Sequence, residues 1–334
     1  MESALTISPP TASARRRVSA DLPLAVGPAI SQMRGSMDLV LTVVAPPNAG
    51  AFSLALREVF AGVGAKGISS RKLDAGESAA TDVFVEGPDL AALRAALEAP
   101  MAGQALDWCV QPLAGRRKRL LVADMDSTII NVECLDEIAD FAGLKAEISA
   151  ITERAMRGEL AFEGALRERV AMLKGLPVTA LQAAYDERVR LNPGARTMVR
   201  TMAANGARCV LVSGGFSFFT SRVAQAALFH AHRANTLLEA DGALTGFVGE
   251  PILGREAKLA ALEQEAKAGA IPLSETLALG DGANDLAMIE AAGLGVAYRA
   301  KPIVAAQADA RIEHTDLTTL LYFQGYSEDA FVTD

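Results

Sequence analysis

Three short apolar runs lie downstream of residue 118, and each is followed at once by polar residues or glycines. They span residues 120–123, 210–212 and 276–280. Such runs, in which apolar and polar positions do not alternate, are typical of parallel strands that are buried on both faces. Amphipathic helical patterns and one further strand pattern alternate with them, at 196–205, 217–227, 255–268, 284–291 and 294–297. This order predicts an α/β fold with a doubly wound, parallel, Rossmann-like sheet.

A helical segment interrupts this alternation after the first run. Apolar positions recur at helical spacing in 132–141, 145–156 and 162–173, and prolines mark the return to the sheet pattern. We therefore expect a helical insert over about 133–195. A hairpin is expected within 235–249.

The N-terminal third of the chain has a different pattern. Residues 1–36 are rich in Ser, Ala and Pro and are expected to form a flexible tail. Strand and helix patterns then follow in the order strand, helix, strand, strand, helix, strand, at 39–44, 50–61, 68–73, 81–85, 88–97 and 105–112. That order predicts a ferredoxin-like α+β domain over 37–113. The basic stretch 115–119 is expected to be a solvated linker, and residues 323–334 a second tail.

Composition and charge narrow the classes of function. The 334 residues carry a net charge of −8, which argues against general binding of nucleic acid or of an anionic membrane surface. No apolar run reaches the ~18 residues of a membrane span, and the N-terminus lacks the pattern of a secretory signal. The three cysteines show no pairing motif, so a cytoplasmic location is the default expectation. Because the net charge is negative, any anionic substrate must be bound by individual groups of a site and not by a basic surface.

The first apolar run ends in two carboxylates, Asp124 and Asp126. Residues two apart in an extended chain share a side, and ligands of open α/β sheets bind beyond the carboxyl ends of the strands. Two close carboxylates repel each other unless a cation or a proton lies between them, and a hard divalent ion such as Mg²⁺ meets that need. The alternative is a solvated turn or helix cap, which Asp, Ser and Thr also favour.

The other two runs end in groups that suit an anion and a metal ion. Ser213 is followed by two glycines whose backbone amides can approach an anion closely. Asp281 and Asp285 add oxygen ligands at the third strand end. Lys258 lies between these runs and, taken alone, is as expected of a solvated surface lysine.

Taken in order, these elements resemble the haloacid dehalogenase superfamily, and within it the phosphoserine phosphatases. The resemblance covers about residues 118–322 and rests on several separate motifs: Asp124-Met-Asp-Ser-Thr128, Glu133-Cys-Leu-Asp-Glu137, the segment 152–158, Phe162-x-x-x-Leu-Arg-x-Arg169, Ser213-Gly-Gly-Phe216, Gly280-Asp-Gly-Ala-Asn-Asp285 and Ala300-Lys-Pro302. It implies a helical cap at 133–195 and Mg²⁺-dependent hydrolysis of O-phospho-L-serine, the last step of serine biosynthesis.

The resemblance also implies roles for individual residues. Asp124 would be the nucleophile that forms an aspartyl-phosphate, and Asp126 the general acid and base. Mg²⁺ would be bound by the Asp124 side chain, the Asp126 carbonyl and Asp281, with Asp285 in support. The phosphate would be bound by Ser213, Gly214, Gly215, Lys258 and Asn284. The substrate would be selected by Glu133, Met156, Phe162 and Arg169, with Glu133 facing the ammonium and Arg169 the carboxylate.

The N-terminal domain resembles an ACT domain, a module that binds amino acids or mediates dimers. A structural or dimerising role is an equal alternative, and a homodimer through this domain is an expectation. Two other functions stay open: a related small-molecule phosphatase or phosphotransferase, and an amino-acid-sensing regulatory protein with an inert hydrolase domain. The intact set of acids, serine and lysine argues against an inert domain.

Overall fold

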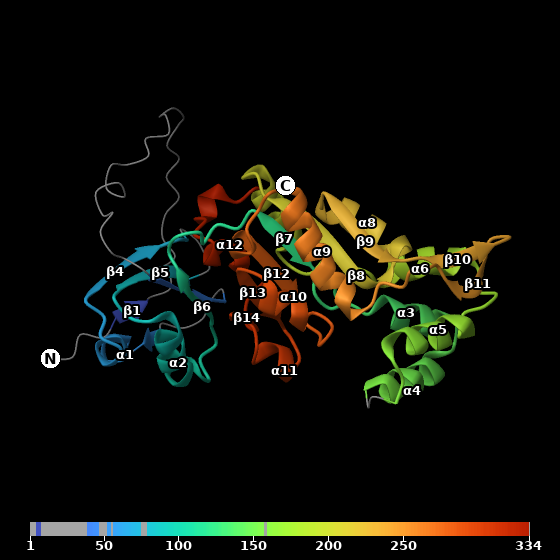
Figure 1. The fold of residues 1–334 in the computed structure, drawn as a ribbon, viewed down its shortest axis with the longest axis horizontal. Helices are drawn as coiled ribbons and strands as arrows, with labels where there is room; N and C mark the ends of the chain where they lie inside the picture. Colours follow the sequence, from blue (N-terminus) through green and yellow to red (C-terminus); the bar gives the residue numbers. More distant parts are fainter. Residues whose placement is uncertain are drawn as a thin grey trace, which may run out of the picture. The chain divides into compact units, whose positions relative to one another are not determined.

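The computed structural model describes residues 5–7, 39–46, 52–54, 56–74, 79–156 and 159–333. The chain divides into two compact units (Figure 1). The first comprises Met1–Arg116 with Tyr322–Ala330, and the second Arg117–Leu321 with Phe331–Asp334. Within the described residues, no helix is both long enough and apolar enough to cross a membrane.

The first unit contains an antiparallel sheet with the strand order expected of a ferredoxin-like fold. The order is β4 (Gly67–Lys72), β5 (Ala79–Glu86), β2 (Leu39–Ala45) and β6 (Asp107–Pro112). The helices of this unit are α1 (Leu56–Gly62) and α2 (Leu90–Met101). Alternate residues of each strand, such as Leu41 and Val43, are fully buried with helix side chains in one hydrophobic core.

The structure differs from the sequence prediction at the N-terminal end of this unit. The helix expected over 50–61 begins at Leu56, and β3 (Phe52–Leu54) precedes it. This strand pairs with β1 (Leu5–Ile7), so part of the predicted tail is in a strand. The rest of residues 1–36 lies outside the described residues.

The expected C-terminal tail is also wrong, because Tyr322–Ala330 packs as part of the first unit. Phe323, at the end of α12 (Thr319–Phe323), is fully buried, and Tyr326 nearly so. A short 3₁₀ helix, Glu328–Ala330, follows. Aromatic side chains that can reach the unit's interior gain more from burial than from solvation.

Arg116 is the centre of a buried polar network in this unit, although the sequence predicted a solvated linker there. Its guanidinium donates to both carboxylate oxygens of Asp82 at 2.8 and 2.9 Å and to the Thr42 hydroxyl at 2.9 Å. It also donates to the carbonyls of Tyr322 and Phe323. Burial alone would raise the pKa of Asp82, but its bonds from Arg116 lower that pKa below its usual value. A buried guanidinium keeps its charge when a carboxylate pairs with it and when acceptors satisfy its N–H groups.

The second unit contains the predicted parallel sheet. Its order is β14 (Ala310–Ile312), β13 (Leu294–Tyr298), β12 (Thr276–Gly280), β7 (Leu120–Ala123), β8 (Arg208–Phe216) and β9 (Ala231–Asn235). One face of this sheet is covered by α9 (Arg255–Ala268), α10 (Leu286–Ala291) and α11 (Pro302–Ala305). The other face is covered by α7 (Ala195–Ala204). The helix α8 (Ser217–Ala227) directly follows β8 along the chain. The predicted α/β fold with helices on both faces is confirmed.

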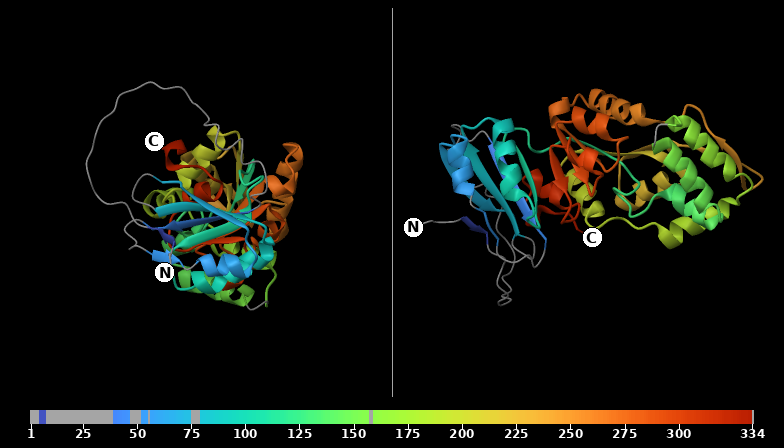
Figure 2. Two further views of the ribbon diagram at one scale, coloured as in Figure 1. Left: turned by 90° about the vertical axis from the view of Figure 1, so that its left-hand side faces the viewer. Right: turned by 90° about the horizontal axis from the view of Figure 1, so that it is seen from below.

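Four helices are inserted between β7 and α7. They are α3 (Cys134–Phe141), α4 (Lys145–Met156), α5 (Phe162–Met172) and α6 (Val178–Arg188), and they form a group of their own within the unit (Figure 2). We call them the cap. The predicted helical insert over 133–195 includes α6, but the pattern did not mark α6 as a separate helix because its apolar positions are spread around the helix and form no stripe.

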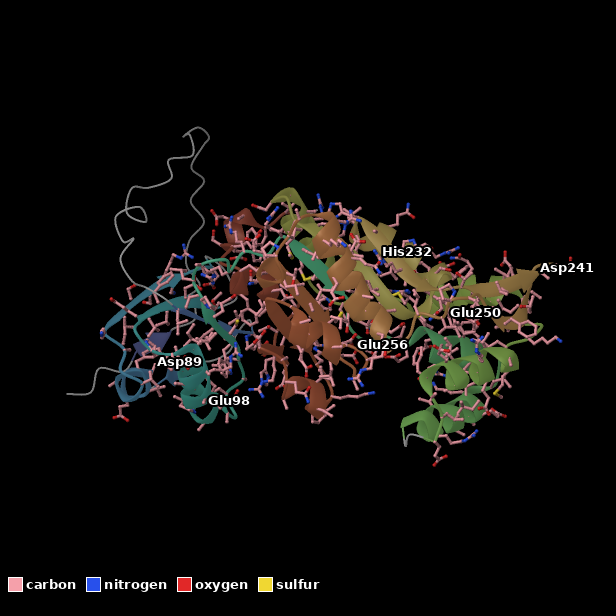
Figure 3. The ribbon with its side chains drawn as sticks, viewed as in Figure 1. Asp89, Glu98, His232, Asp241, Glu250 and Glu256 are labelled. Carbon is pink, nitrogen blue, oxygen red and sulfur yellow. The ribbon has the colours of Figure 1, made fainter. Side chains whose placement is uncertain are left out.

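The rest of the second unit, which we call the sheet domain, contributes a hairpin that contacts this cap. It consists of β10 (Leu237–Ala240) and β11 (Ala243–Val248), with Asp241 at its tip (Figure 3). Asp241 and Gly242 both have positive φ, which suits a two-residue turn. The amides of Gly175 and Val178 donate to carbonyls of this hairpin and its turn, and the Leu244 amide donates back to Leu176. These bonds join the α5–α6 connection to the hairpin.

Candidate active site

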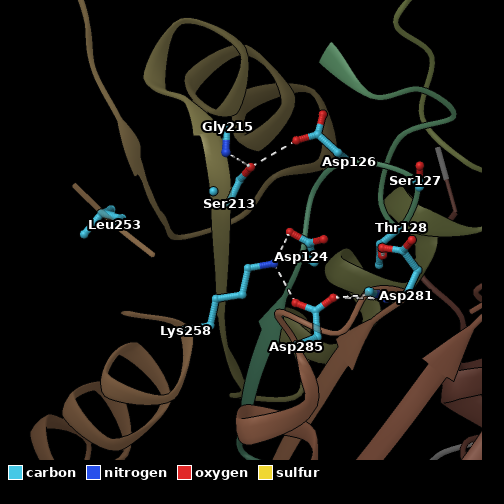
Figure 4. A network of polar contacts seen from close by, with 12 residues as sticks. Asp124, Asp126, Ser127, Thr128, Ser213, Gly215, Leu253, Lys258, Asp281 and Asp285 are labelled. Atoms are coloured by element: carbon cyan, nitrogen blue, oxygen red, sulfur yellow. Dashed lines mark hydrogen bonds and ion pairs between the residues drawn. The ribbon is translucent and has the colours of Figure 1, made fainter. Parts of the chain in front are cut away.

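The carboxyl ends of three neighbouring strands bring the predicted catalytic groups together (Figure 4). Asp124 follows β7, Ser213 lies on β8, and Asp281 follows β12. The strands pair in parallel in the order β12, β7, β8, so their ends lie at one edge of the sheet. The apolar strand residues before these groups are fully buried and fix the position of the edge.

Lys258 is fully enclosed between two carboxylates. Its Nζ lies 2.6 Å from Asp124 Oδ1 and 2.5 Å from Asp285 Oδ1. Burial opposes the charge of the ammonium, but Asp124 and Asp285 outweigh this and raise the pKa of Lys258 above its ordinary value. Lys258 is therefore a charged group of the site and not the solvated surface lysine of the alternative interpretation.

Asp124, Asp281 and Asp285 form a cluster that fits one metal ion. One carboxylate oxygen from each lies within 4.8 Å of the others. Burial, followed by the charge of Asp285, raises the pKa of Asp124 well above its usual value and raises that of Asp281. Lys258 pairs with Asp124 and Asp285, so the three carboxylates, when ionised, carry more negative charge than this one ammonium offsets, and a hard divalent cation would neutralise the excess. The donor set, all oxygen, is the one such ions prefer.

Asp126 has a different set of partners from Asp124. Its Oδ1 accepts the backbone N–H of Cys134 at 3.0 Å, and its Oδ2 accepts the hydroxyl of Ser213 at 3.1 Å. Burial raises the pKa of Asp126, although these bonds act in the opposite direction. A carboxyl with a raised pKa and fixed orientation suits a group that gives and takes a proton. Its carboxylate is outside the cluster of three.

Ser213 and Gly215 form a small donor loop beside Asp126. The Gly215 amide donates to Ser213 Oγ at 2.8 Å. A Cβ at Gly215 would lie 3.0 Å from both Ser213 Oγ and Asp126 Oδ2, which is closer than an ordinary van der Waals contact, so glycine suits this close approach. Asn284, also predicted to bind phosphate, folds its side-chain oxygen over Gly282 and leaves no room for a Cβ there.

Glu133 lies immediately before α3, at the N-cap position of that helix. Its Oε1 accepts the Ser127 hydroxyl at 2.6 Å, and Ser127 adopts a positive φ of 55°. Its side chain reaches solvent, yet the surrounding protein raises the pKa of its carboxyl to about 7. The main cause is desolvation, followed by the negative charge of Asp126. A cation placed beside Glu133 would reverse that shift.

Arg169 is on α5 of the cap and has neutral partners. Its guanidinium donates to the carbonyl of Ala165 and to the Thr152 hydroxyl, at 3.1 and 3.3 Å. No ion pair to it occurs among the described residues. Desolvation lowers the pKa of Arg169, while the nearby charges of Asp136 and Glu133 oppose this. A partly desolvated guanidinium without an anion is suited to bind the carboxylate of a ligand.

Phe162, at the start of α5, extends from the cap to the sheet domain. A Cβ at Gly214 would lie 3.3 Å from its ring, and one at Gly254 would lie 3.4 Å from it. Phe162 is thus next to the donor loop. Met156 is the last residue of α4, and its side chain is outside the described part of the structure.

Comparison with known proteins identifies the family. Residues 121–290 match the family of haloacid dehalogenase-like hydrolases. A phosphoserine phosphatase of a Polaromonas species is 47% identical over 209 residues, which are 61% of this chain and 88% of that protein. This chain belongs to the haloacid dehalogenase-like hydrolases. The resemblance to phosphoserine phosphatases that the motifs predicted is confirmed.

Solved structures of such hydrolases share the fold. A haloacid dehalogenase family hydrolase of Salmonella enterica serovar Typhi has a TM-score of 0.73 at 27% identity, over 87% of this chain and 99% of that one. A structure described as a phospho-aspartyl intermediate analogue of phosphoserine phosphatase has a TM-score of 0.58 at 40% identity, over 62% of this chain and 99% of that one.

Several residues that position the site of this hydrolase have no role among the sequence predictions. Thr128 donates to Asp281 Oδ1 at 3.2 Å, Ser127 bonds to Glu133, and the Cys134 amide bonds to Asp126. Ser127 and Thr128 lie in the Asp-x-Asp-Ser-Thr motif, and their place in that motif was the only sequence feature that could have pointed to a role in the site. The Cys134 bond comes from the backbone, so no residue type could have indicated it.

Proposed function

We propose that this hydrolase is a Mg²⁺-dependent phosphoserine phosphatase, which converts O-phospho-L-serine and water to L-serine and phosphate. The observation that carries the proposal is the arrangement around Asp124. This buried carboxylate lies against Lys258 and beside two further acids, while Asp126 is oriented separately by Cys134 and Ser213. The relatives named as phosphoserine phosphatases support the choice of substrate.

In the first step, a carboxylate oxygen of Asp124 attacks the phosphorus of the substrate. A bond forms between that oxygen and phosphorus as the bond from phosphorus to the serine oxygen breaks. Asp126 gives its proton to the departing serine oxygen, so L-serine leaves as an alcohol. The raised pKa of Asp126 favours the protonated form that this step needs. The products of the step are an aspartyl-phosphate at Asp124 and a deprotonated Asp126.

In the second step, water replaces the aspartyl oxygen on phosphorus. Asp126 takes a proton from the water as its oxygen attacks, the bond between phosphorus and the Asp124 oxygen breaks, and inorganic phosphate leaves. Both catalytic carboxyls return to their starting protonation states. One pair of residues therefore performs both steps.

Mg²⁺ would be bound by the carboxylates of Asp124 and Asp281 and the carbonyl of Asp126, with Asp285 in support. When bound, the ion offsets the repulsion between a carboxylate and an anionic phosphate. Lys258, Ser213 and the amides of Gly214 and Gly215 would donate to the phosphate oxygens, with Asn284 as a further donor. Such donors act because they are oriented before the reaction begins.

Substrate selection would depend on the cap and its edge. Glu133 would bind the ammonium of phosphoserine and Arg169 its carboxylate, both through charge-assisted hydrogen bonds. Met156 and Phe162 would enclose the small substrate and exclude water. The place of the reaction, as the last step of serine biosynthesis, follows if phosphoserine is the substrate.

Phosphate release from L-phosphoserine, with Mg²⁺ and with EDTA, tests the proposal. A panel of phosphothreonine, sugar phosphates and p-nitrophenyl phosphate serves as the comparison. We expect Mg²⁺-dependent hydrolysis with a strong preference for phosphoserine. Hydrolysis of other esters without that preference would favour a related phosphatase or phosphotransferase. No hydrolysis of any ester would favour the amino-acid-sensing alternative.

A further inference from the structure

Asn235 uses its whole side chain to join two segments of the sheet domain. It is the last residue of β9 and is only 2% exposed. Its Nδ2 donates to the carbonyl of Gly214 at 2.8 Å and to that of Leu253 at 3.2 Å. Its Oδ1 accepts the amide of Leu253 at 2.7 Å. Both donors and the acceptor of the amide group are therefore satisfied.

The two segments that Asn235 joins both lead to the active site. Gly214 lies between Ser213 and Gly215 in the donor loop. Leu253 immediately precedes Gly254 and α9, the helix that carries Lys258. Figure 4 shows Leu253 on a chain segment separate from that of Ser213. The buried side-chain amide of Asn235 thus forms hydrogen bonds both with the donor loop and with the segment that leads into α9, the helix of Lys258.

The same two segments form the surface that Phe162 of the cap contacts, at Gly214 and Gly254. Three residues before Leu253, Glu250 pairs with Arg167 of α5 at 2.5 Å (Figure 3). Both partners of that pair are largely exposed, so it contributes little to stability by itself. The position of residues 250–254 therefore also bears on where the cap meets the donor loop.

The bond to Gly214 sets the direction of a predicted phosphate donor. The Gly214 carbonyl and the Gly215 N–H belong to one peptide group, and in a trans peptide they point in opposite directions. Because Asn235 binds the carbonyl, the N–H of Gly215 points toward Ser213 Oγ and the site. A peptide between two glycines has little steric preference of its own and could otherwise rotate.

We infer that Asn235 is a positioning residue for phosphate binding, which fixes the Gly214–Gly215 peptide so that its N–H faces the phosphate. The inference rests on the proposed function, since it takes the donor loop as the phosphate site. It predicts that Asn235 acts on the phosphate half of the substrate and not on the half that Glu133 and Arg169 would bind.

The test uses Asn235→Ala and Asn235→Asp in the full chain. Asn235→Asp keeps the volume and the acceptor for the Leu253 amide but places a carboxylate oxygen against two carbonyls, so it carries the test if Asn235→Ala does not fold. The readouts are kcat with phosphoserine and with p-nitrophenyl phosphate, and the inhibition constants of inorganic phosphate and of L-serine. Gln111→Ala is the control, because Gln111 is also a buried amide that donates to a carbonyl, at 2.7 Å, in the other unit.

We expect both variants to lower kcat by about 10²-fold on both esters, which is the usual effect of losing one oriented donor. The inhibition constant of phosphate should rise at least about tenfold, while that of L-serine stays unchanged. Gln111→Ala should lower the melting temperature and leave all four constants unchanged. The inference is overturned if the Asn235 variants lower only the melting temperature, or if they weaken phosphate and serine equally.

Failure of the proposed function would look different. A wild-type enzyme that prefers another ester would refute the choice of phosphoserine. The effects of Asn235 on p-nitrophenyl phosphate and on inorganic phosphate would still be measurable in that enzyme.

Discussion

Lys258 Nζ and Asp124 Oδ1 are 2.6 Å apart in an almost fully buried ion pair. The lysine comes from α9 and the aspartate from the end of β7, so the pair joins two elements that lie far apart in the sequence. Asp285 is a second partner of the same ammonium. Burial and the charge of Asp285 raise the pKa of Asp124 well above its usual value, and the Lys258 ammonium is the neighbour that acts against this rise.

Lys258→Met should reduce both activity and stability. Without the ammonium, Asp124 and Asp285 would be buried with no positive partner among them, which typically costs about 3–5 kcal/mol of unfolding free energy. We expect kcat to fall by roughly 10²–10³-fold, since an oriented charge on the phosphate is lost as well. Phosphate release and urea denaturation at neutral pH measure the two effects. Lys267→Met, at an exposed position of the same helix, is the matched control and should be close to wild type.

Mg²⁺ should stabilise the protein through the three clustered carboxylates. A ligand that binds only the folded state raises its melting temperature, and the stabilisation grows with the logarithm of 1 + [L]/Kd. We expect Asp281→Asn to weaken Mg²⁺ binding at least about tenfold, as seen when metal sites lose supporting groups. Calorimetric titration and melting curves with Mg²⁺ and with EDTA measure this without an activity assay. Asp241→Asn, at the exposed tip of the hairpin, should respond to Mg²⁺ like the wild type, and an equal response from Asp281→Asn would contradict the assignment.

The pH dependence of substrate binding should report on Glu133. Since the pKa of this carboxyl is about 7 in the free enzyme, it loses its negative charge as the pH falls through 7. The kcat/KM for phosphoserine should therefore decline below pH 7 more steeply than the kcat/KM for p-nitrophenyl phosphate, which has no ammonium. In Glu133→Gln the two profiles should have the same shape. A wild-type enzyme with identical profiles for the two esters would show that Glu133 does not bind the ammonium.

Arg169→Ala should raise the KM for phosphoserine about 10- to 100-fold, because a charge-assisted hydrogen bond contributes about 1.5–3 kcal/mol. The KM for p-nitrophenyl phosphate, which lacks the carboxylate, should change little. Arg167→Ala provides a control on the same helix, where the side chain pairs with Glu250 instead. Equal losses on both esters in Arg169→Ala would refute the assignment of the carboxylate site.

Much of the sheet domain and its catalytic edge could be predicted because the information is local. Apolar runs define β7, β8 and β12, and the polar residues directly after them come together at one edge.

The buried state of Arg116 could not be predicted, because its partners Asp82 and the carbonyls of Tyr322 and Phe323 are distant in the sequence. Lys118 is similar: it donates to the carbonyls of Ser274 and Gly293. The strand β14 was missed because it has only three residues, and β9 was missed because it is partly polar. The role inferred for Asn235 also needs the folded structure, since Asn in a strand pattern indicates no particular contact.

The aspartyl-phosphate is the central claim, and trapping it is the most direct test. Asp126→Asn should slow the attack of water, because no carboxylate remains to take its proton. We would quench this variant in acid during turnover of p-nitrophenyl phosphate, whose leaving group departs without the proton that Asp126 gives to serine, and map the phosphoryl group by mass spectrometry of the digested protein. The account predicts one phosphoryl group on the peptide that contains Asp124, absent from an Asp124→Asn variant treated in the same way. A phosphoryl group on another residue, or active turnover by Asp124→Asn, would contradict it.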